Sequence, residues 1–324
     1  ANDETLFRVP KMPDVDPAIK PPYLKDGVAL DHLRHGHKPY DPACSTCQFM
    51  KMKAHQHRRI KDEAEEGQLS ADLAGPWPES INGAKYLMLM VRRKARMYFM
   101  ATLPNKTSNG VKEAMIDFKL LLKGIWRFHS DRGKEFMGEM DRWMRDNLIV
   151  HTTRPGYDSK AHGIAERAIL EVSQGIRVLL HQAGAPRTLW DEAARHFVDI
   201  LNRTLHTLPD GGKVIPSVAE REGATGKQEK LHSDDDPLKW PPWGCRVVAL
   251  VPRVDRDSKL DAVAVLGLFL GYDVSVTGGV RVALLKDNNG SLEVEKIIVS
   301  TTVRTKDEEF ALAASKTPSV EELK

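Results

Sequence analysis

Three acidic residues that lie far apart in the chain occupy positions from which their side chains could meet. Asp72 lies in a short segment before a Gly-Pro turn, and Asp131 follows the alternating stretch WRFHS. Glu166 lies beside the apolar stripe of a predicted long helix, which could direct its carboxylate along a sheet edge. Convergent carboxylates repel one another unless a divalent cation lies between them, and Mg²⁺ prefers such oxygen ligands. The pattern indicates metal-assisted phosphoryl transfer, whereas any one of these acids taken alone would be read as a surface charge.

A second group of side chains that could bind a metal lies in the stretch DHLRHGHKPYDPACSTCQ. Cys44 and Cys47 form a C-x-x-C pair, which is the usual half of a tetrahedral zinc site, and His32 and His37 complete four ligands. Alternatives to His32 as the first ligand are His35, His55 and His57. A module this small cannot bury enough apolar area to fold alone, so zinc would supply its stability. Cys245 lies in a predicted strand and is expected in the core.

The composition is that of a globular protein. Its 324 residues are 41% hydrophobic and 29% charged, which is sufficient for a large core and for more than one domain. No apolar run approaches the ~20 residues of a membrane span, and the first residues lack the apolar stretch of a signal peptide. A basic block covers residues 48–61, although the net charge of +3 is too small to prove a nucleic-acid partner. The chain begins without Met, so we expect that it is cut from a longer polyprotein.

Strands and helices alternate around the three acids. Strands are predicted over residues 86–91, 96–103, 126–129 and 148–153, and helices over 111–122, 136–144, 159–182 and 189–201. This order predicts a mixed sheet that is flanked by helices. Residues 207–243 are rich in Gly, Pro and charge and indicate a linker. Short strands follow, with DNNG at 287–290 as a hairpin turn, and they predict a small all-β barrel.

Several of these motifs occur together in one known family. HSDRGKEF, with 34 residues between its Asp131 and the Glu166 of GIAER, resembles the acidic triad of retroviral-type integrases. DLAGPWPESINGAKYLML, TTRPGYDSKAHGIAERAI and LWDEAARHFVDILNRT resemble the core of copia-type retrotransposon integrases. GHKPYDPACSTC is similar to the family's HHCC zinc module, and the region from WGCRVVALVP to IIVSTTV is similar to its SH3-like β-domain. The resemblance covers roughly residues 28–305.

The resemblance implies an α/β fold with an RNase H-like mixed sheet, a small N-terminal zinc module and a C-terminal all-β SH3-like barrel. The expected segments are an extended arm (1–25), an HHCC-type zinc module (26–62), an RNase H-like core (65–206), a linker (207–243), an SH3-like barrel (244–305) and an acidic flexible tail (306–324). Asp72, Asp131 and Glu166 would hold Mg²⁺ or Mn²⁺. The expected zinc ligands are His32, His37, Cys44 and Cys47.

The resemblance also implies an enzyme, a DNA integrase with endonuclease and polynucleotidyl transferase activity that uses two metal ions. Water would trim the 3′ ends of the element's DNA, and each 3′-hydroxyl would then attack a target phosphodiester. The implied partners are the element's DNA ends, target DNA and further copies of the chain, with no membrane and no small-molecule substrate. The implied location is the nucleus, with a cytoplasmic virus-like particle as a second site.

Basic side chains near Glu166 are expected to neutralise DNA phosphates, which gives affinity that depends on salt and little on sequence. They are Arg154, Lys160 and Arg167. Two alternative functions remain open. One is a nuclease or cut-and-paste transposase on the same core, and the other is a catalytically silent, zinc-containing DNA-binding or assembly protein derived from such an element.

Overall fold

The computed structural model describes residues 67–121, 124–153, 163–207, 211–228, 236–251, 258, 260, 262–289 and 291–312. The chain divides into two compact units, Ala1–Ile60 and Lys61–Lys324, and every described residue belongs to the second. The expected arm and zinc module lie outside the described residues, and so do Arg154 and Lys160. None of the helices in the described ranges is long and apolar enough to cross a membrane.

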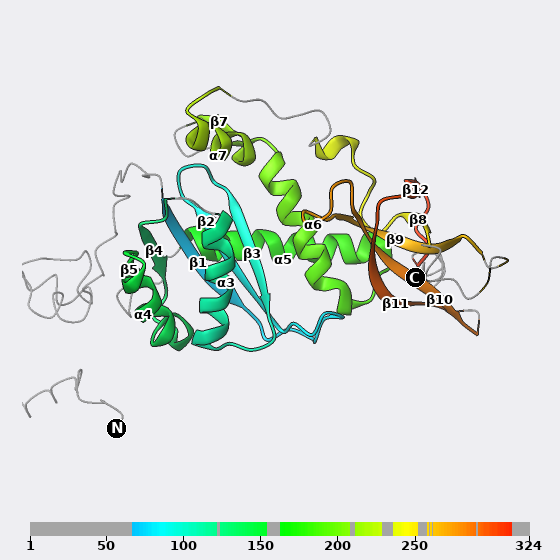
Figure 1. The fold of residues 1–324 in the computed structure, drawn as a ribbon, viewed down its shortest axis with the longest axis horizontal. Coiled ribbons are helices and arrows are strands. Elements are labelled where there is room, and N and C mark those ends of the chain that lie inside the picture. The colour runs from blue at the N-terminus through cyan, green and yellow to red at the C-terminus, as the bar shows by residue number, and fades with distance from the viewer. Residues whose placement is uncertain are drawn as a thin grey trace, which may run out of the picture. The chain divides into compact units, whose positions relative to one another are not determined.

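The first sheet is mixed and has five strands (Figure 1). Its strands are β1 (Gln68–Ala74), β2 (Tyr86–Arg92), β3 (Tyr98–Leu103), β4 (Arg127–Ser130) and β5 (Val150–Thr153), in the order β3-β2-β1-β4-β5. β1, β2 and β3 pair antiparallel, whereas β4 runs parallel to β1 and β5 parallel to β4. β1 is therefore the central strand, and β1, β3, β4 and β5 all end at the same edge of the sheet.

Helices cover both faces of this sheet, as the sequence predicts. The helical elements are α3 (Ser108–Leu121), η2 (Lys134–Phe136), α4 (Glu139–Asp146), α5 (Gly163–Ala183), η3 (Arg187–Leu189) and α6 (Trp190–Arg203). Side chains along a strand alternate between faces. Ala71 and Met90 accordingly lie in a buried cluster with residues of α3 and α4, whereas Leu89 and Val91 lie in a second cluster with residues of α5 and α6. This alternation determines which face each acid of β1 and β4 occupies.

Helices α5 and α6 pack tightly against each other at Gly175. A Cβ atom at Gly175 would lie 2.4 Å from atoms of the Phe197 ring, well inside van der Waals contact. Glycine destabilises an ordinary helix position by about 1 kcal/mol relative to alanine. Its presence here is explained by the close packing of Phe197, which leaves no room for a Cβ atom.

We expect Gly175→Ala to lower the free energy of unfolding by about 1–3 kcal/mol, because overpacking outweighs the gain in helix propensity. Chemical denaturation of the purified chain measures this change. Gly163→Ala is the control in the same helix, since no other element in the described part of the chain comes within 4 Å of its Cβ position. Adding Phe197→Leu should restore part of the loss, and a Gly175→Ala variant as stable as the wild type would contradict the packing argument.

The second sheet is antiparallel throughout. Its strands are β8 (Arg246–Leu250), β9 (Ala264–Tyr272), β10 (Val280–Asn288), β11 (Ser291–Ser300) and β12 (Val303–Lys306), in the order β11-β10-β9-β8-β12. β10 and β11 form the hairpin predicted from DNNG, in which Asn289 adopts the left-handed conformation with φ of 54°. Cys245 is fully buried beside β8, which confirms its predicted place in the core.

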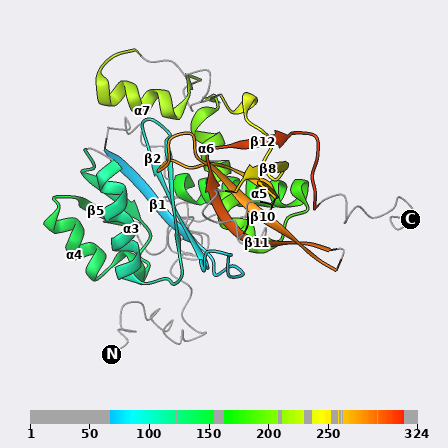
Figure 2. The same cartoon turned by 45° about the vertical axis from the view of Figure 1, so that its right-hand side comes forward.

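The second sheet lies against helices α5 and α6 (Figure 2), and the two share a hydrophobic core. Leu268 and Leu270 of β9 and Ala283 of β10 lie in the same buried cluster as Trp190 of α6 and Ala183 of α5. A buried ion pair crosses the same junction, where Arg281 Nη2 lies 2.6 Å from Glu192 Oε1. The two sheets are thus parts of one packed unit within the described residues.

The expected linker and tail both contain ordered structure. Between the sheets lie β6 (His206–Thr207), β7 (Lys213–Val214), α7 (Pro216–Thr225) and η5 (Pro237–Lys239). α7 contacts α6, and Glu220 Oε1 lies 2.7 Å from Arg92 Nη1 at the end of β2. Past β12, Leu312 is buried and Glu309 pairs with Arg246, so residues 306–312 differ from the expected flexible tail. These tertiary contacts could not be predicted from the local composition of the two segments.

Candidate active site

Asp72 projects from the central strand on the face that α5 covers. It pairs in register with Leu89 of β2, and directly paired residues of neighbouring strands share a face. Leu89 belongs to the buried cluster that contains α5 residues. The Asp72 side chain is half-buried, and its Oδ1 accepts a hydrogen bond from the backbone N–H of Leu73 at 2.8 Å. The carboxylate therefore lies within the sheet, toward the edge at which β1 ends.

Asp131 lies beside Asp72 because of the parallel register between β1 and β4. Ser70 pairs with His129 at the end of the shared register, and Asp72 and Asp131 each lie two residues further along. If the register continues past β4, it sets the two aspartates opposite each other on the same face. Asp131 directly follows β4, and its Oδ1 accepts a hydrogen bond from the Gly133 N–H at 2.9 Å. This bond closes a tight turn and fixes the carboxylate at the sheet edge.

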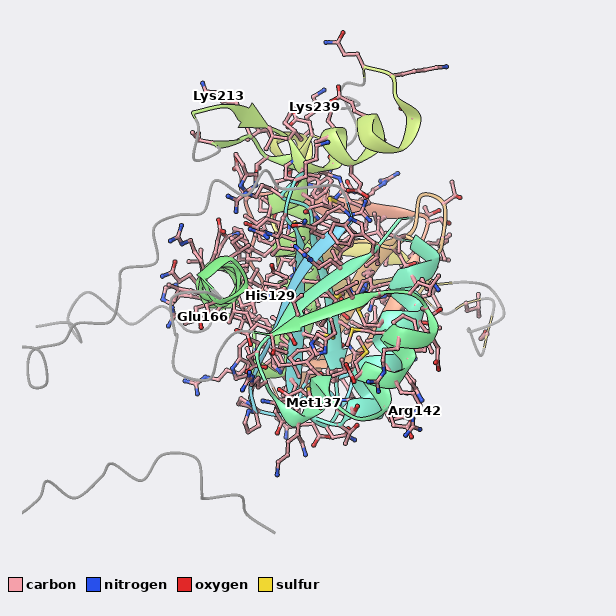
Figure 3. All side chains as sticks on the ribbon, turned by 90° about the vertical axis from the view of Figure 1, so that its left-hand side faces the viewer. His129, Met137, Arg142, Glu166, Lys213 and Lys239 are labelled. Carbon is pink, nitrogen blue, oxygen red and sulfur yellow. The ribbon has the colours of Figure 1, made fainter. Side chains whose placement is uncertain are left out.

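Glu166 lies in the first turn of α5, whose apolar stripe covers that same face of the sheet. Ala168, Val172 and Ile176 of α5 are buried in the cluster that contains Leu89. Figure 3 shows Glu166 on α5, which is seen nearly end-on, with His129 of β4 also labelled. Glu166 is exposed, as expected for a residue beside the stripe.

Among the described residues, no group of three or more His, Cys, Asp and Glu side chains is close enough to hold a metal ion. The strand register thus directs Asp72 and Asp131 toward the same edge of the sheet, and Glu166 lies on the helix over the same face without completing a three-ligand cluster among the described residues. Two carboxylates nevertheless fit Mg²⁺, which is usually bound by one or two carboxylates together with waters and substrate phosphates. The aspartate pair is therefore a suitable donor set for a hard cation.

A lysine and a glutamate that the sequence analysis did not single out lie at the same edge. Lys106 Nζ lies 2.8 Å from Glu135 Oε1, and the Glu135 side chain is only 5% exposed. The pKa of Lys106 is raised, first by this hydrogen bond and then by the negative charges of Glu135, Asp131 and Asp72, against the opposing effect of burial. Lys106 therefore remains protonated and lies within the electric field of both aspartates.

A buried hydrogen-bonded chain supports the Asp131 turn from behind. Ser130 Oγ lies 2.8 Å from His151 Nε2, and His151 Nδ1 lies 3.2 Å from Asp141 Oδ1. This Ser-His-Asp order resembles a hydrolase triad, but Ser130 has no exposed surface from which it could attack a substrate. Its Oγ lies 2.9 Å from the backbone oxygen of Asp131. The arrangement suits a role in holding the turn rather than in nucleophilic catalysis.

The positive charges expected near Glu166 are only partly described. Arg167 is exposed on α5, next to Glu166, where a phosphate could reach it. Arg132 and Lys134 are exposed on either side of Gly133 in the Asp131 turn. All three are exposed basic side chains close in sequence to Asp131 or Glu166, and such side chains can contact phosphates.

The described unit is thus an α/β protein with a mixed sheet, helices on both faces and paired carboxylates suited to a divalent cation. The chain is 26% identical over 243 residues to the retrovirus-related Pol polyprotein from transposon TNT 1-94 of Nicotiana tabacum, an alignment that covers 71% of this chain and 17% of the relative. This similarity confirms the predicted resemblance to a retrotransposon polyprotein. The chain spans about a sixth of the length of that curated relative.

Among solved structures, the chain is similar to the catalytic core domain of BIV integrase, with 16% identity and a TM-score of 0.39. The alignment covers 51% of this chain and all of that domain. No family model matches the chain.

Proposed function

We propose that this chain is the integrase of a copia-type retrotransposon and joins the element's DNA ends to target DNA. The observation that supports the proposal is the parallel register of β1 and β4, in which Ser70 pairs with His129. Continued by two residues, this register would set Asp72 opposite Asp131 on the face covered by the helix of Glu166. The similarity to a retrovirus-related Pol polyprotein supports the same assignment. Under this proposal the first sheet and its helices are the RNase H-like core, and the second sheet is the SH3-like domain.

Asp72 and Asp131 would hold Mg²⁺ or Mn²⁺, and Glu166 would complete the ligand set when DNA binds. The bound ions would activate the attacking oxygen and stabilise the leaving one in an in-line displacement at phosphorus. The chain's own contribution is orientation, because the Leu73 and Gly133 amides fix one oxygen of each aspartate. Arg167, together with Arg154 and Lys160, would neutralise the phosphates on either side of the scissile bond.

The zinc module is part of this proposal. His32, His37, Cys44 and Cys47 would hold one Zn²⁺ in a structural site, since four protein ligands leave no open position for a substrate. We further propose that the integrase acts as a homo-oligomer in the nucleus, because integration requires that two DNA ends reach one target. The endonuclease activity would be limited to trimming the element's own 3′ ends.

A strand-transfer assay tests the proposal. The purified chain is incubated with Mg²⁺, a plasmid target and labelled duplexes that carry the terminal sequences of the element, including a 3′-recessed version that bypasses trimming. We expect labelled plasmid from the recessed duplex, and no product when EDTA is present. Nicking of the plasmid without joining would favour the related nuclease instead, and DNA binding without any cleavage would favour the catalytically silent protein.

A further inference from the structure

The Lys106–Glu135 ion pair lies at the edge of the candidate site, with the Glu135 side chain buried and the Lys106 side chain 43% exposed. Lys106 lies in the loop between β3 and α3, at the edge of the sheet where β1 and β4 also end. Its partner Glu135 lies in the short η2 helix, four residues past Asp131, and is almost fully buried. Burial of a carboxylate is costly unless a cation compensates it, so Lys106 is held at this place.

The Glu135 carboxylate also contacts the turn that carries Asp131. A Cβ atom at Gly133 would lie 2.3 Å from Glu135 Oε1, so this carboxylate packs directly against the backbone of the turn. The Gly133 N–H in turn donates to Asp131 Oδ1. An unbroken series of contacts therefore connects Lys106 to Glu135, to Gly133 and to the candidate ligand Asp131.

The ammonium of Lys106 faces three negative groups at once. It is hydrogen-bonded to Glu135 and also interacts electrostatically with Asp131 and Asp72. Two neighbouring aspartates at a sheet edge repel each other when no cation is bound. A fixed positive charge beside them relieves this repulsion, but the same charge opposes the arrival of a divalent ion.

We propose that Lys106 is a positioning residue that stabilises the Asp72–Asp131 pair in the absence of metal, and that Glu135 keeps its ammonium from occupying the metal position. The inference rests on the proposed function, because it takes the aspartates as metal ligands. The two members of this ion pair therefore have opposite effects on metal affinity. Loss of the Lys106 charge strengthens metal binding, whereas loss of the Glu135 charge leaves Lys106 to pair with the aspartates and weakens it.

The test is calorimetric measurement of Mn²⁺ binding by the full zinc-loaded chain. The Asp131→Asn variant reports the Mn²⁺ binding that does not involve the aspartate pair. We expect Lys106→Met to lower the Kd for Mn²⁺ roughly three- to tenfold and Glu135→Gln to raise it by a similar factor. The double variant should return close to the wild-type Kd. The control for removal of a paired lysine is Lys112→Met, since Lys112 forms an ion pair of similar length, 2.9 Å, with the exposed Glu139 of α4.

A purely structural ion pair predicts the same sign for both single variants, because either substitution would loosen the turn. If the Kd for Mn²⁺ changes in the same direction in both single variants, or does not change in either, the inference is overturned while the proposed function stays in place. Failure of the proposed function looks different, since the wild type would then show no Mn²⁺ binding that Asp131→Asn removes. Lys106→Arg provides a further check, because retention of the charge should keep the Kd near that of the wild type.

Discussion

Asp131→Asn is expected to reduce strand transfer by about a thousandfold while the fold remains intact. The substitution removes one carboxylate charge from the pair formed by Asp72 and Asp131, and loss of metal-assisted stabilisation costs several kcal/mol of the barrier. Asparagine keeps a side-chain carbonyl oxygen, so the hydrogen bond from the Gly133 N–H can still form. The loss of activity should therefore appear without loss of thermal stability, and the strand-transfer assay and a thermal melt measure the two quantities.

Asp236→Asn is the matched control for this substitution. Asp236 Oδ1 also accepts a backbone hydrogen bond from two residues ahead, the Leu238 N–H at 3.1 Å, but it lies in the segment between the two sheets. We expect this variant to retain wild-type activity. Equal activity of Asp131→Asn and the wild type would remove Asp131 from the mechanism, and a fall in melting temperature would instead indicate a structural role.

Arg281→Ala is expected to lower the free energy of unfolding by about 3–5 kcal/mol, because it removes the closest cation from the buried carboxylate of Glu192. Arg281 Nε and Nη2 lie 2.8 and 2.6 Å from the two oxygens of Glu192, which has no exposed surface. Its Nη1 lies 2.9 Å from Asp273 Oδ2. Asn82 Nδ2 also donates to Glu192, so the loss of Arg281 disturbs a network that joins the second sheet to α6. Urea denaturation of the purified variant measures this effect.

Two comparisons isolate the cause of that loss. Lys85→Ala breaks the ion pair with Glu79, whose side chains are 47% and 60% exposed, and should change stability by less than about 1 kcal/mol. Combining Arg281→Met with Glu192→Gln removes both charges and should recover a large part of the loss. If Arg281→Ala proves as mild as Lys85→Ala, the junction between the sheets does not depend on this buried pair.

The sequence predicted the alternating strands and helices of the first sheet because each element repeats its own hydrophobic period. It also indicated Asp131 correctly at a strand end, since the alternation of WRFHS stops there. The central place of β1 could not be predicted in the same way, because strand order depends on long-range pairing. The in-register approach of Asp72 and Asp131 becomes evident only from the pairing of β1 with β4.

Other features escaped prediction for identifiable physical reasons. Helix α7 begins at Pro216 and ends before Gly226, which has φ of 67°, and both are recognised helix boundaries. The surrounding glycines and charges nevertheless favoured a linker. Lys106 and Glu135 carry no local signal, because each is an ordinary charged residue until the fold pairs them. The burial of Leu268 against α5 and α6 also has no local signal in the sequence, because it depends on tertiary packing.

The most direct measurement is anomalous diffraction from crystals of the full chain grown with Mn²⁺ and a DNA end. The account predicts an anomalous peak about 2 Å from carboxylate oxygens of both Asp72 and Asp131, with the Glu166 carboxylate bound to the same ion or to an adjacent one. Peaks only at other sites, or an occupied aspartate pair with Glu166 turned away from the metal and the DNA, would contradict it.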